Sequence, residues 1–158
     1  QMLVERGVRL IDLSTMMPRY QPYGRGLIAE HEEGPEAEIN PYKGTFDLLK
    51  ATKEIKDAVP GGIFVCTGLT WLEQFVGNVA AGGIRDGWFD LGGFGRQGFA
   101  YPDFAKDLLQ DKTMYRNKCC VLCDKCYDLI QIGHCQTGCV MRDQEVYLPL
   151  YKKNVLKK

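Results

Sequence analysis

Residues 61–75 read GGIFVCTGLTWLEQF, and this stretch decides the fold class. Ile63–Thr67 is short, apolar and β-branched, which is typical of a buried strand. A glycine follows the strand, and Thr70 with Glu73 then forms an S/T-x-x-E capping box, which predicts a helix that continues to about Ala81. A strand that passes through a short glycine turn into a helix is the repeating unit of α/β proteins.

The alternation of strand and helix extends to both sides of this stretch. Further strands are predicted at Val8–Leu13 and Trp88–Phe94. Helices are predicted over Met2–Arg6 (as the last turn of a longer helix), over Phe46–Val59 with Thr45 as the N-cap, and from Pro102 to about Gln110. This order predicts right-handed βαβ units and a parallel sheet, with ligands at the carboxyl ends of its strands.

Residues 14–43 are predicted to form a long loop, because they are rich in proline and show little periodicity. Loops of this length are uncommon in compact domains and are usually functional or covering. The segment lies between the first predicted strand and the helix that follows it.

Composition limits the classes of function. The chain has 158 residues, of which 45% are hydrophobic and 25% charged, as in a soluble globular domain. Its 20 basic residues balance 20 acidic ones, so no nucleic-acid partner is expected. The longest apolar stretch, Gly61 to Ile84, contains polar residues and is broken by glycines, so no membrane span is expected. Many thiols without a signal peptide indicate the cytoplasm. The first residue, Gln1, suggests a piece of a longer protein.

Two of the predicted strands end in glycine. Gly68 follows the second strand, and Gly95 with Arg96 follows the third. Glycine lets the backbone approach an anion closely, and an arginine adds a bidentate charge, so the two loops together could bind a phosphate. Glycine at a strand end is equally common turn chemistry, and Arg96 could equally be a surface residue.

Six of the seven cysteines lie between Cys119 and Cys139. Four of them have the spacing C-x2-C-x2-C-x12-C, which is typical of iron–sulfur ligands: Cys120, Cys123, Cys126 and Cys139. Zinc is the alternative, with the pairs Cys123/Cys126 and Cys135/Cys139 and with His134 in reserve. A disulfide framework is the third possibility, disfavoured by the odd cysteine count.

Residues 61–75 and 82–109 (GGIRDGWFDLGGFGRQGFAYPDFAKDLL) resemble the last two βα units of the old yellow enzyme family of FMN-dependent oxidoreductases. The cysteine spacing is similar to that of the trimethylamine dehydrogenase branch, and the related 2,4-dienoyl-CoA reductase branch differs in the last two gaps. Residues 138–152 resemble the end of the barrel domain of NADH:flavin oxidoreductases.

This resemblance implies a TIM (β/α)8 barrel that binds FMN and a [4Fe–4S] cluster, with NAD(P)H as co-substrate. Residues 1–112 would hold the last three βα units, and residues 113–158 a Cys-rich iron–sulfur lobe and tail. The FMN phosphate would bind at Gly68, Leu69, Gly95 and Arg96. The cluster would bind at Cys120, Cys123, Cys126 and Cys139.

A complete barrel of this kind needs eight strands and about 250 residues. The family's catalytic side chains come from earlier strands, so no catalytic residue is assigned in this chain. We therefore expect the rest of the barrel as a partner, and an isolated chain that is inactive. The alternative function is a non-catalytic zinc- or cluster-binding module with a structural or docking role.

Overall fold

The computed structural model describes residues 1–14 and 41–156. This part of the chain has mixed α/β architecture, built on a sheet of β1 (Leu10–Leu13), β2 (Ile63–Thr67) and β3 (Leu91–Gly93). All pairs are parallel and follow the order β1-β2-β3, with Leu10 opposite Ile63 and Val65 opposite Leu91. The parallel sheet predicted from the alternating pattern is therefore present, whereas a complete barrel is not shown.

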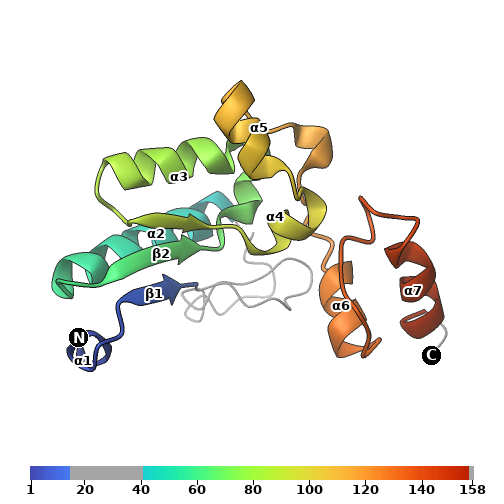
Figure 1. Ribbon diagram of the computed structural model, residues 1–158, viewed down its shortest axis with the longest axis horizontal. Coiled ribbons are helices and arrows are strands. Elements are labelled where there is room, and N and C mark those ends of the chain that lie inside the picture. The colour runs from blue at the N-terminus through green and yellow to red at the C-terminus, as the bar shows by residue number, and fades with distance from the viewer. Residues whose placement is uncertain (15–40, 157–158) are drawn as a thin grey trace, which may run out of the picture.

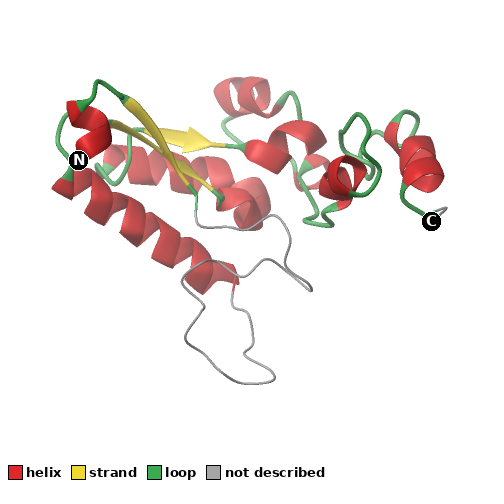
Figure 2. Ribbon diagram, turned by 90° about the horizontal axis from the view of Figure 1, so that it is seen from below, coloured by secondary structure: helices red, strands yellow, loops and turns green. Residues whose placement is uncertain are grey.

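Two long helices cover one face of the sheet. They are α2 (Pro41–Ala58) and α3 (Val76–Arg85), which Figure 2 shows on the same side of the strands. Phe64 and Cys66 point to this side and are fully buried, and the Cys66 thiol meets the Thr52 hydroxyl of α2. Cys66 is thus a small core residue, as an apolar strand position predicts.

The opposite face of the sheet is open within the described residues. Leu10, Ile63 and Leu91 share this face through the strand register and are 60%, 45% and 48% exposed. The same face also carries Asp12 and Thr67, which are hydrogen-bonded to each other. Apolar side chains thus lie on both faces of the sheet, as in strands that are buried on both sides.

The shorter elements continue from the sheet toward the C-terminus. They are α1 (Met2–Glu5), the 3₁₀ helix η2 (Leu69–Phe75), α4 (Gly95–Ala100), α5 (Phe104–Asp111), the 3₁₀ helix η3 (Arg116–Lys118), α6 (Lys125–Gln131) and α7 (Tyr147–Asn154). Figure 1 shows α6 and α7 beyond α4, at the opposite end of the molecule from α1. Residues 119–139, called the cysteine segment below, thus follow the carboxyl ends of the strands.

The predicted capping box is wrong. Thr70 lies inside η2, and Glu73 has φ 47° and ψ −118°, which breaks the helix instead of starting it. The Glu73 carboxylate pairs with Arg116 at 3.0 Å. The α-helix then runs from Val76 to Arg85, past the predicted end at Ala81.

Several predicted helix and strand boundaries also differ from those in the structure. Thr45 is not an N-cap, because α2 begins at Pro41, a residue that favours the first helical turn. The third strand is shorter than Trp88–Phe94, since the Trp88 N–H bonds to the Gly83 carbonyl at the end of α3. The last predicted helix begins at Phe104 instead of Pro102, and α4 was not predicted.

The predicted loop over residues 14–43 falls mostly outside the described residues. Its last three positions belong to α2, so this part of the prediction is wrong. The helix is extended here because Pro41 is compatible with a first turn.

Candidate phosphate pocket and cysteine cavity

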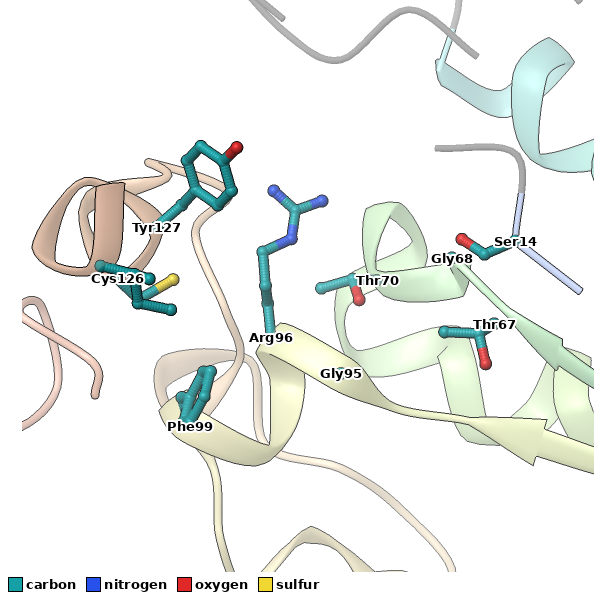
Figure 3. Close-up of a pocket in the computed structure, with 10 residues that line it drawn as sticks. Ser14, Thr67, Gly68, Thr70, Gly95, Arg96, Phe99, Cys126 and Tyr127 are labelled. Carbon is teal, nitrogen blue, oxygen red and sulfur yellow. The ribbon is translucent and has the colours of Figure 1, made fainter. Parts of the chain in front are cut away.

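A pocket of about 290 Å³ opens at the carboxyl ends of the three strands. Figure 3 shows its lining side chains, which come from the ends of β1 and β2, from η2, from α4 and from α6. The residues that line the pocket are Ser14, Thr67, Gly68, Thr70, Gly95, Arg96, Phe99, Cys126, Tyr127 and Ile130. Its position is where α/β proteins bind ligands.

The chain builds this pocket from two consecutive strand ends. Gly68 has φ 119°, a left-handed conformation that only glycine adopts readily, and it turns the chain from β2 into η2. Gly95 starts α4, and a Cβ there would meet no atom within 4 Å. Leu69, whose backbone was predicted to bind phosphate, has a fully buried side chain in the core.

Arg96 projects into the pocket from α4 (Figure 3). Its Nη1 donates to the Oδ1 of Asp124 in an ion pair, and the two side chains are 23% and 26% exposed. Three hydroxyl side chains also line the pocket: Ser14, Thr67 and Thr70. The guanidinium group and the hydroxyls of Ser14 and Thr70 are donors that suit a phosphate, whereas the Thr67 hydroxyl donates to Oδ1 of Asp12.

A second, smaller cavity of about 10 Å³ lies beside the pocket. All four cysteines of the C-x2-C-x2-C-x12-C pattern line it, together with Arg96, Phe99, Val121, Asp124 and Val140. The structure thus brings the four predicted ligands to one place. In the described parts of the chain, no three His, Cys, Asp or Glu side chains are close enough to hold one metal ion.

The two cavities share three lining residues: Arg96, Phe99 and Cys126. Arg96 stands at the boundary, since its guanidinium lines the larger pocket and pairs with a residue of the cysteine segment. Groups bound in the two cavities would therefore share contacts with these three residues.

Burial sets the protonation of the cysteine thiols. Burial, with a smaller contribution from the neighbouring Cys120, raises the pKa of Cys126 to about 11. Burial also raises the pKa of Cys120, an increase that the N–H of Leu122 partly offsets by donating to the Cys120 sulfur at 3.4 Å. These thiols are protonated near neutral pH, so metal ligation would release protons.

Hydrogen bonds from three directions hold the cysteine segment. The Cys120 N–H donates to the Oε1 of the fully buried Gln97 at 3.0 Å. Arg142 donates from Nε and Nη2 to the Cys119 carbonyl at 3.1 and 2.8 Å. Thr137 donates from its hydroxyl to the Cys126 carbonyl. Sequence reasoning missed Gln97 and Asp124, because no spacing rule connects them to the cysteines.

The remaining candidates lie outside the cysteine cavity. The Cys135 sulfur contacts the Leu129 carbonyl at 3.5 Å and the Asn154 amide at 3.7 Å, and His134 is exposed. Cys119 is buried and contacts the Tyr115 carbonyl. Three cysteines of the zinc set line the cysteine cavity and Cys135 does not, whereas all four cysteines of the cluster set line it.

No helix in the described residues is both long and apolar enough to cross a membrane. No protein-family model matches the chain, and searches of the curated proteins and of the solved structures find no match to it. The resemblance to flavin oxidoreductases therefore stays a prediction from the sequence.

Proposed function

We propose that this chain is part of an FMN-dependent NAD(P)H oxidoreductase, in which it supplies the site for the FMN phosphate and the site for a [4Fe–4S] cluster. The observation that carries this proposal is the shared boundary of the two cavities. Arg96, Phe99 and Cys126 line both, so a phosphate-bearing cofactor and a cysteine-bound group would be neighbours. Electron transfer between two redox cofactors requires such proximity.

The larger pocket has the chemistry of a phosphate site. Arg96 contributes a permanent cation, and Gly68 and Gly95 leave backbone accessible at the ends of β2 and β3. The hydroxyl of Thr70 adds a neutral donor at the same place. Because α4 and η2 are short, the side chains and exposed amides contribute more than any helix dipole.

The cysteine cavity has the chemistry of a cluster site. Four cysteines are among the residues that line it, and four cysteine thiolates are the usual ligands of a [4Fe–4S] cluster. A bound FMN would supply two-electron exchange with NAD(P)H, and a bound cluster would supply single-electron exchange. The protein's contribution is placement and electrostatics. The missing strands of the barrel would supply the contacts to the flavin ring, and the cytoplasm would keep the thiols reduced.

The cluster is tested by anaerobic reconstitution of the chain with iron and sulfide. We expect about four iron and about four sulfide per chain, with a broad brown absorbance. The matched pair is Cys120→Ser and Cys135→Ser, since only Cys120 lines the cavity. The first variant should lose most of its iron and the second should keep it. Equal iron contents in these two variants would contradict the ligand set.

The phosphate pocket is tested by comparing FMN with riboflavin, which lacks the phosphate. Arg96→Ala should weaken FMN binding about tenfold or more and leave riboflavin binding unchanged, because a charge-assisted bond contributes roughly 1.5–3 kcal/mol. Arg85→Ala is the matched control, as this arginine pairs with Asp86 at 2.7 Å on an exposed surface. Equal FMN affinity in Arg96→Ala and Arg85→Ala would refute the phosphate site.

The alternative function is a zinc- or cluster-binding module without catalysis. The observation in its favour is the hydrogen-bonded packing of the cysteine segment, which a structural metal would reinforce. A colourless protein that contains one zinc and no acid-labile sulfide, and that binds FMN no better than riboflavin, would favour this alternative.

A further inference from the structure

Asp124 occupies a special place in the cysteine segment. It lies between two of the cavity cysteines, Cys123 and Cys126, and has φ 54° and ψ 8° at the start of α6. A non-glycine residue in this left-handed conformation is uncommon, although Asn and Asp tolerate it better than most. The turn aims the Asp124 carboxylate at Arg96, with which it forms an ion pair.

The ion pair leaves most of the guanidinium free for another anion. Asp124 accepts from Nη1 of Arg96, and an arginine has five N–H donors in a planar fork. The guanidinium also lines the larger pocket, so its remaining donors are available to a phosphate there (Figure 3). A long, flexible side chain that is held at one edge loses less rotamer entropy when it binds at the other.

We propose that Asp124 is a positioning residue of the phosphate pocket: it orients Arg96 for the phosphate and makes binding there depend on the fold of the cysteine segment. This inference rests on the proposed phosphate site. Gln97 reinforces the connection, because the residue next to Arg96 holds the backbone of Cys120. Arg96 and Gln97 are thus neighbours on α4, and they bind two residues of the cysteine segment, Asp124 and Cys120.

Electrostatics acts in the opposite direction, since a carboxylate near a phosphate repels it. The two effects differ in sign. If orientation dominates, removal of the Asp124 side chain weakens phosphate binding, whereas if repulsion dominates, the same removal strengthens it. We assign the dominant effect to orientation, because both partners of the pair are about three-quarters buried and the guanidinium would otherwise sample many rotamers.

The test uses two variants that keep the left-handed backbone of residue 124. Asp124→Gly removes the side chain without strain, and Asp124→Asn keeps an acceptor oxygen but removes the charge. FMN and riboflavin affinities are measured by flavin fluorescence with the iron-free, reduced chain, so that loss of a cluster cannot mimic the effect. Asp86→Gly, which breaks the exposed pair with Arg85, is the control.

We expect Asp124→Gly to weaken FMN binding at least about fivefold, Asp124→Asn to weaken it less, and both to leave riboflavin binding unchanged. An Asp124→Gly chain that binds FMN as tightly as the wild type, or more tightly, overturns the inference. If Arg96→Ala weakens FMN binding and Asp124→Gly does not, only the role of Asp124 fails. If Arg96→Ala has no effect, the phosphate site itself fails, and the inference fails with it.

Discussion

The side-chain carbonyl of Gln97 accepts a hydrogen bond from the backbone N–H of Cys120 at 3.0 Å, across 23 residues of sequence. Gln97 is fully buried, and its Nε2 has no hydrogen-bond acceptor among the residues that the structure describes. The hydrogen bond to the Cys120 N–H offsets part of the cost of burying the Gln97 amide. It also holds the backbone of Cys120, a predicted cluster ligand.

Gln97→Met removes the acceptor and keeps a similar volume. The Cys120 N–H is then buried without a partner, which costs about 1–3 kcal/mol. The removal of the unpaired Nε2 offsets part of this cost, so we expect a loss near the lower end of that range. Urea unfolding measures it, with Gln110→Met on the exposed face of α5 as the control. An unchanged unfolding midpoint in Gln97→Met would show that the bond is dispensable.

Arg142 binds the carbonyl of Cys119 through two nitrogen atoms. It follows Cys139 by three residues, so it connects the fourth predicted ligand to the segment that carries the other three. Arg142→Lys keeps the charge but loses the planar fork, and we expect the reconstituted chain to release iron to a chelator several-fold faster. Arg116→Lys, on an exposed arginine that pairs with Glu73, should release iron at the wild-type rate. Equal release rates in the two variants would contradict this role.

The unfolding free energy should depend on pH through Asp107. Hydrogen bonds from Lys118, at 2.8 Å, and from Tyr101 lower the pKa of this carboxyl below 3.8. A depressed pKa in the folded state means that Asp107 stabilises the protein above pH 3.8 and that this stabilisation is lost as the pH falls through the folded value.

Asp107→Asn should therefore lower the urea midpoint at pH 6, and the difference from the wild type should shrink toward pH 3. Asp103→Asn, a change at an exposed position before the same helix, serves as the control. A difference that stays constant between pH 6 and pH 3 would mean that the Asp107 charge does not contribute.

The sequence predicted the fold best where one local pattern decides the structure. Ile63–Thr67 has the predicted bounds, because an unbroken apolar run next to glycines has few other conformations. The capping box failed because Thr70 and Glu73 match a spacing rule, whereas the chain turns through the left-handed Gly68 and forms a 3₁₀ helix first. A two-residue motif is too weak to specify a helix start when the preceding glycine has another role.

The candidate site, too, was predictable only where a local sequence pattern decides it. Cysteine spacing identifies the four thiols that line one cavity, since ligand spacing is a property of the local sequence. The pairing of Arg96 with Asp124 was not predictable, because residues 28 apart meet only after the chain has folded. The same holds for Gln97 and Cys120. Long-range polar contacts leave no periodic signal.

The open face of the sheet gives the last prediction. Leu10, Ile63 and Leu91 are exposed on the side that no described helix covers, and β1 and β3 have no strand on their outer edges within the described residues. Apolar faces and unpaired strand edges favour association. In the complete barrel that the resemblance implies, further strands would cover both, whereas in this chain alone we expect a second copy to do so.

The 158-residue chain should accordingly associate at micromolar concentrations, as measured by sedimentation velocity. Ile63→Lys should shift the chain toward the monomer, because a charge on this face opposes burial. Leu109→Lys is the matched control, since Leu109 is 73% exposed on α5, away from the sheet. The associated chain supplied with FMN should still not oxidise NADH or NADPH, because the resemblance assigns the contacts to the flavin ring to earlier strands of the barrel. A monomeric chain with turnover of about 1 s⁻¹ or more, within the ordinary enzyme range, would show that no further barrel strands are needed.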